Sequence, residues 1–174
     1  MKRIFIEENK EYQIDFTKAI WAMDSLNSIY HQAKIQLSDV DFIAETEEEL
    51  IFIEYKNANI KNASNPNAFQ PQADKAIQKV VRKYYDSLFY IMGLRKAREK
   101  RKYYVYILEY PKGDGVTRRA IRNKLQSSLP FLLQQQNQDM ERLIDEVMVL
   151  SIDEWNERFV QFPLTKCRNN FLNN

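Results

Sequence analysis

Three side chains at the ends of two apolar segments have types that could carry out hydrolysis together: Asp41, Glu54 and Lys56. Glu54 and Lys56 end the most apolar stretch of the chain, which begins with residues 50–53. Because side chains alternate along a strand, Glu54 and Lys56 are expected to project from the same side. A carboxylate and an ammonium beside a sheet interior are costly to desolvate unless each has a partner or a ligand.

Asp41 begins the other apolar segment, and an acidic turn at residues 47–49 separates the two. A hairpin at this turn would bring Asp41 alongside Glu54. Two carboxylates can hold Mg²⁺, which prefers oxygen ligands, and a bound metal lowers the pKa of water and offsets charge on a phosphate. A neighbouring lysine can orient or deprotonate that water. The residue types therefore predict phosphodiester hydrolysis with Mg²⁺ or Mn²⁺. Asp39 would face the same way as Asp41 on an extended strand, so either could be the first acid.

Composition excludes several other kinds of site. The chain has three glycines, one histidine and one cysteine. So few glycines argue against a phosphate-cradling loop, and Gly113 and Gly115 fit a turn better. A lone His31 argues against histidine metal sites and a Ser–His–Asp triad. A lone Cys167 excludes an intramolecular disulfide and a thiolate zinc cluster, which favours a reducing, cytoplasmic location. No apolar run is long enough for a membrane helix.

Periodicity predicts one α/β domain over residues 1–174, with a mixed central sheet flanked by helices. An amphipathic helix is expected first, then a short strand, a hairpin, and alternating helices and strands. The expected helices are 15–31, 73–91, 116–128 and 151–159; the expected strands are 34–37, 41–46, 50–56, 103–108 and 146–150, with a loop at 61–72.

The order helix, Asp41-Phe42-Ile43, turn, Ile53-Glu54-Tyr55-Lys56-Asn57, helix, strand resembles the PD-(D/E)XK nuclease superfamily. The resemblance implies a restriction-endonuclease-like core (α-β-β-β-α-β). It also implies that Asp41, Glu54 and the Tyr55 backbone carbonyl bind the metal, and that Lys56 positions the attacking water. Val40 stands where the family has proline.

Many members of that superfamily also place an acid on the first helix, near the metal. Asp15 and Asp24 are the candidates, and Asp24 is preferred because it lies at the rim of the apolar face. On the helix after the motif, the family often has a glutamine or lysine facing substrate. Gln78 and Lys83 could take that position, or could be simply solvated.

Basic residues are clustered although the net charge is only +2. Six of the eight residues in 95–102 are basic, and a second basic set follows in 112–124. Such runs are either solvated surface or a contact surface for the phosphate backbone. The residues expected to bind nucleic acid are Lys83, Arg95, Lys96, Arg98, Arg118 and Arg119.

These observations favour a metal-dependent nuclease acting on DNA, with no membrane partner and with homodimerisation if both strands are cut. An alternative keeps the fold without catalysis, as a nucleic-acid-binding or protein-interaction module. A third function is a regulatory protein that binds a partner through the acidic turn at 45–49.

Overall fold

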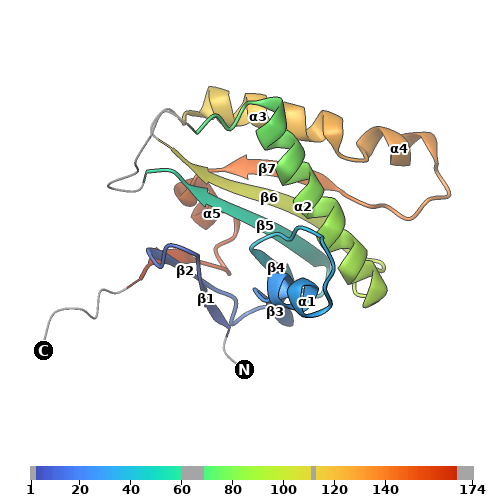
Figure 1. Cartoon of the computed structure of the whole chain (residues 1–174), viewed down its shortest axis with the longest axis horizontal. Coiled ribbons are helices and arrows are strands. Elements are labelled where there is room, and N and C mark those ends of the chain that lie inside the picture. Colours follow the sequence, from blue (N-terminus) through green and yellow to red (C-terminus); the bar gives the residue numbers. More distant parts are fainter. Residues whose placement is uncertain (1–2, 60–68, 111–112, 168–174) are drawn as a thin grey trace, which may run out of the picture.

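The strand that ends near Glu54 lies at the centre of a five-stranded sheet (Figure 1). The computed structural model describes residues 3–59, 69–110 and 113–167. The strand order is β3 (Trp21–Met23), β4 (Phe42–Glu45), β5 (Glu49–Asn57), β6 (Arg101–Glu109) and β7 (Glu146–Leu150). β3, β4 and β5 are antiparallel, whereas β5, β6 and β7 are parallel, so the predicted mixed sheet is confirmed.

Helices connect the parallel strands, as a crossover connection requires. Helix α2 (Asp74–Gly93) joins β5 to β6, and α3 (Gly115–Ser128) and α4 (Phe131–Gln136) lie between β6 and β7. The predicted face of α2 is buried at Ile77, Val80, Tyr84 and Leu88. Together α2 and α3 cover one face of the sheet through a core that includes Phe52 and Tyr104.

The other face of the sheet packs against the last helix and a small second sheet. Helix α5 (Ile152–Arg158) begins with the predicted cap, because Ser151 and Glu154 form a capping box. Trp155 is fully buried there, among side chains from β4, β5 and β6. The second sheet has the antiparallel strands β1 (Ile4–Ile6), β2 (Tyr12–Asp15) and β8 (Leu164–Lys166).

The predicted first helix is wrong. Residues 15–31 form the end of β2, a turn, β3 and only a short helix, α1 (Leu26–Gln32). The helical spacing placed Ile20 with Phe16, yet Ile20 is 54% exposed while Phe16 is buried. Pairing with strands distant in sequence, Tyr12 with Lys166 and Trp21 with Glu45, overrides the local periodicity.

The short strand predicted at 34–37 is also wrong. Lys34 has a positive φ of 56°, which ends α1, and Ile35 is 46% exposed, so the segment crosses the surface as a loop. Residues 61–68 of the predicted loop at 61–72 lie outside the described residues. Among the helices of the described chain, none is long and apolar enough to cross a bilayer.

Candidate metal and phosphodiester site

Asp41 and Glu54 come together because of the register of the β4–β5 hairpin. Phe42 pairs with Ile53 in this antiparallel hairpin, so Asp41, the residue before Phe42, lies opposite Glu54, the residue after Ile53. Alternation directs both carboxylates to the face that α2 covers, together with Ile43. The predicted convergence of the two acids is therefore present in the fold.

The two carboxylates differ in their access to solvent. The Asp41 side chain lines a cleft and is 37% exposed, whereas the Glu54 side chain is 9% exposed. Burial and the neighbouring Asp41 raise the pKa of Glu54 to about 8, against the opposing effect of Lys83. Burial also raises the pKa of Asp41, although Lys83 and a backbone hydrogen bond act to lower it.

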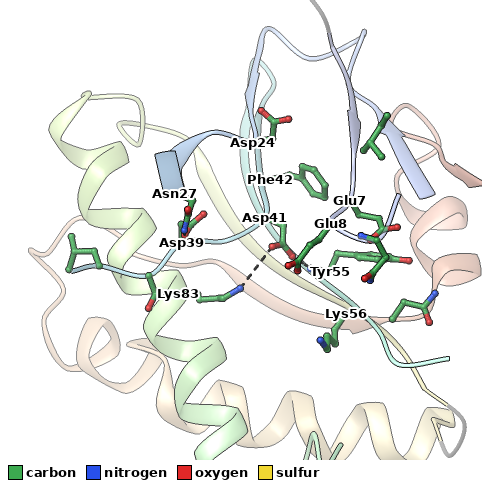
Figure 2. Close-up of a pocket in the computed structure, with 15 residues that line it drawn as sticks. Glu7, Glu8, Asp24, Asn27, Asp39, Asp41, Phe42, Tyr55, Lys56 and Lys83 are labelled. Carbon is green, nitrogen blue, oxygen red and sulfur yellow. Dashed lines mark hydrogen bonds and ion pairs between the residues drawn. The ribbon is translucent and has the colours of Figure 1, made fainter. Parts of the chain in front are cut away.

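The ammonium that neutralises these acids comes from Lys83 on α2. Its Nζ lies 2.7 Å from Glu54 Oε1 and 2.8 Å from Glu54 Oε2. The distance from Nζ to Asp41 Oδ1 is 3.9 Å, a contact drawn as a dashed line in Figure 2. The ammonium therefore interacts with both carboxylates. Burial acts to lower the pKa of Lys83, but the two acids outweigh it and the net pKa is raised.

Lys56 lies near the two acids, as predicted, but it is not paired with either of them. It follows Glu54 on the same strand and lines the cleft, but among the described residues it has no salt bridge. Its Nζ instead lies 5.9 Å from the centroid of the Phe69 ring. Lys83 was expected to face substrate, and sequence reasoning missed that it would pair with Glu54. The available signal was its place next to the buried Tyr84 at the margin of the apolar helix face.

A backbone contact holds Asp41 in place. The Tyr55 N–H donates a hydrogen bond to Asp41 Oδ2 at 2.7 Å. This bond uses one carboxylate oxygen and leaves Oδ1 facing the ammonium. Because the N–H and C=O of one strand residue point to the same side of the strand, the Tyr55 carbonyl is directed to the edge where Asp41 lies. That placement is compatible with its predicted role as a metal ligand.

A cleft of about 640 Å³ opens beside this pair, where β5 continues past the start of β4. We call it the acidic cleft, because among the described residues its lining holds more acids than bases. Figure 2 shows these side chains around Asp41. The acids of the lining are Glu7, Glu8, Asp24, Asp39 and Asp41, and the bases are Lys56 and Lys83.

The other candidate acids lie at the periphery of the site or outside it. Asp39 lines the acidic cleft, but its Oδ1 accepts a hydrogen bond from Asn27 at 3.0 Å. Asp24 also lines the cleft, from the bend between β3 and α1 rather than from a long first helix. Asp15 ends β2 and accepts hydrogen bonds from Thr17. Glu8, on the β1–β2 hairpin, was missed because that hairpin was not predicted.

The predicted basic residues do not line the acidic cleft, apart from Lys83. Lys96 Nζ lies 2.6 Å from Glu45 Oε2, at the end of the β4–β5 pair remote from Glu54. Arg95 and Arg98 belong to the same connection between α2 and β6. On α3, Arg118 and Arg119 both line a second pocket; Arg118 Nε lies 2.9 Å from Glu154, whereas Arg119 is exposed. Their role in binding nucleic acid stays a prediction.

The donor set fits a hard divalent cation with few protein ligands. In the described part of the chain, no group of three histidine, cysteine, aspartate or glutamate residues is placed to hold a metal. Mg²⁺ nevertheless commonly uses one or two carboxylates, with water and substrate oxygens completing its coordination. The Asp41–Glu54 pair matches that pattern, and a positive charge already lies between the two acids.

Comparisons of the chain with protein-family models, with curated proteins and with solved structures found no match.

Proposed function

We propose that this protein is a metal-dependent nuclease that hydrolyses phosphodiester bonds, with DNA as the substrate. The observation that carries the proposal is a pair of carboxylates that face each other on adjacent strands: Asp41, which lines the acidic cleft, and Glu54, which is buried beside it. They interact with one shared cation, the ammonium of Lys83.

Each residue of the site has a distinct task in this proposal. Asp41 and Glu54 hold Mg²⁺ or Mn²⁺, with the Tyr55 carbonyl as a further ligand. The bound metal supplies Lewis acidity toward water and phosphate oxygen. In the metal-free chain Lys83 binds the same oxygens, and Lys56, which lines the cleft, offers a second positive charge. Both ammonium groups can contact a phosphate that enters there.

The fold supports a similarity to the PD-(D/E)XK core in part. The hairpin, the crossover helix α2 and the parallel strand β6 follow one another in the expected order. The long first helix is missing from this order, and β3 takes its place at the edge of the sheet. The restriction-endonuclease-like core therefore remains a proposal.

The charge of the acidic cleft bears on how a substrate would bind. Acids outnumber lysines in the described lining, so a phosphate entering alone would meet net repulsion. A divalent cation on Asp41 and Glu54 would reverse the local charge. We therefore expect substrate binding at this cleft to require the metal.

The proposal is tested by incubating the chain with single-stranded and duplex DNA and with RNA, in Mn²⁺ and in chelator. We expect cleavage that needs Mn²⁺ and is reduced at least about 100-fold in Asp41→Asn and Glu54→Gln, the scale of losing a major electrostatic contribution. Glu157→Gln, which changes an exposed glutamate on α5, is the matched control and should cleave normally. If wild type cleaves none of these substrates, or if the two site variants match the control, the nuclease proposal is wrong.

A second function is favoured by the hydrogen bonds that Glu54 already has. Both of its oxygens already accept hydrogen bonds from Lys83, as in a structural ion pair. A binding module without catalysis would keep this pair. It would bind DNA in a salt-sensitive way through basic residues such as Arg119, without cleavage in any metal.

A further inference from the structure

Lys83 occupies the position that a bound cation would need. Its Nζ lies within hydrogen-bond distance of both Glu54 oxygens and 3.9 Å from Asp41 Oδ1. The same three oxygens are the ones that the proposed metal would use. A second positive charge cannot share this small space with the ammonium without strong repulsion.

We infer that Lys83 is the exchangeable counter-ion of the Asp41–Glu54 pair, which a divalent cation displaces into the acidic cleft. This inference rests on the proposed function, since it concerns the same two carboxylates. It assigns Lys83 a positioning role: the ammonium keeps the two acids together until the metal arrives.

The two partners of this ion pair differ in their freedom to move. Asp41 is fixed by the Tyr55 N–H, and Glu54 belongs to the central strand with paired strands on both sides. Lys83 is attached to the margin of α2 by a flexible four-carbon stem, and its side chain is 30% exposed. The acids therefore form a rigid site, and the ammonium is the part that can leave.

The acidic cleft gives the displaced ammonium a place to go. Lys83 lines the cleft, as does Asp39, whose charge acts on the lysine. Moving the ammonium into the cleft exchanges its nearly buried partner, Glu54, for the more exposed Asp39. Lys56 lines the same cleft without a carboxylate partner among the described residues, so it serves as the matched control lysine.

The test is a Mg²⁺ titration of the full chain, followed by ¹H–¹⁵N spectra with two reporters. The Tyr55 amide reports on the metal, because it donates to Asp41. The Lys83 ammonium, assigned with Lys83→Met, reports on the ion pair. We expect both signals to change with one midpoint, and the ammonium signal to be lost as it exchanges with solvent. If the Tyr55 amide shifts while the Lys83 ammonium stays, the inference is wrong and the metal site stands. If neither responds to millimolar Mg²⁺, the proposed function fails as well.

A second measurement uses affinity. Without a competing ammonium, Lys83→Met should bind Mg²⁺ about tenfold more tightly than wild type, the scale of one charge-assisted hydrogen bond. Lys56→Met should stay within about twofold of wild type, because no counter-ion is removed. Equal affinities in wild type and Lys83→Met would overturn the inference.

Discussion

Glu45 is the acid whose removal should reveal how much the basic connection between α2 and β6 contributes to stability. It is 7% exposed at the end of β4, and it binds Lys96 at 2.6 Å and Lys100 at 2.9 Å. The Lys96 ammonium also lies 4.6 Å from the centroid of the Trp21 ring. Replacing one partner of a nearly buried ion pair leaves the other charges uncompensated, which costs up to about 3–5 kcal/mol when burial is complete.

Both lysines are partly exposed, with 29% and 17% of their side chains accessible, so screening reduces this cost. We expect Glu45→Gln to lower the free energy of unfolding by about 2 kcal/mol at pH 7. For a chain of this size that corresponds to roughly 4–8 °C in the melting temperature. The measurement is urea unfolding, followed by tryptophan fluorescence.

The dependence on pH gives a sharper test. Burial acts to raise the pKa of Glu45, but Lys96 and Lys100 outweigh it and the net pKa is lowered. A lowered folded-state pKa means that the stabilisation is complete above the unfolded value of about 4.3 and is lost as the pH falls through the folded value. The difference between wild type and Glu45→Gln should therefore be constant near neutrality and shrink below about pH 4.

The control is Glu48→Gln, three residues further along the chain in the turn between β4 and β5. Glu48 Oε2 lies 3.0 Å from Arg101, but the Glu48 side chain is 78% exposed, so we expect a change below about 0.5 kcal/mol. Equal effects of the two substitutions at pH 7, or a Glu45→Gln effect that persists undiminished to pH 3, would refute the reasoning.

Three further predictions concern single side chains. Ser151→Ala should lower the free energy of unfolding by about 1 kcal/mol in thermal denaturation, because it removes the capping box of α5; an unchanged melting temperature would contradict this. Tyr104→Phe should cost about 1–2 kcal/mol in urea unfolding, because the buried hydroxyl donates to the Val80 carbonyl at 2.7 Å; no loss would show that this bond is weak. Glu54→Gln should remove the effect of Mg²⁺ on the Tyr55 amide, and a wild-type response in this variant would exclude Glu54 as a ligand.

Local sequence was sufficient where one short segment carries the whole signal. The continuous apolar run from Leu50 to Ile53 predicted a strand buried on both faces, and all four residues are fully buried in β5. The acidic turn then fixed the hairpin, and the hairpin alone places Asp41 opposite Glu54. The periodicity of α2 was equally clear, since its buried positions repeat at helical spacing.

The N-terminal region shows where local pattern failed. Its apolar residues have helical spacing, but the backbone pairs with β4 and with β8, which lies at the other end of the chain. No local window contains those partners. The β1–β2 hairpin, which brings Glu8 to the acidic cleft, pairs segments that are close in sequence, and it was missed because the chain from Asp15 onward was assigned to a helix.

The identity of the charge partners was decided by the tertiary structure alone. The sequence determined that two acids meet at the end of β5, because strand alternation and hairpin register are local properties. It could not determine that Lys83 rather than Lys56 neutralises them, or that Lys96 and Lys100 are bound to Glu45. Long side chains reach whichever opposite charge the packing of helix on sheet brings near. Which charge that is depends on contacts between residues distant in the chain, and those exist only in the folded protein.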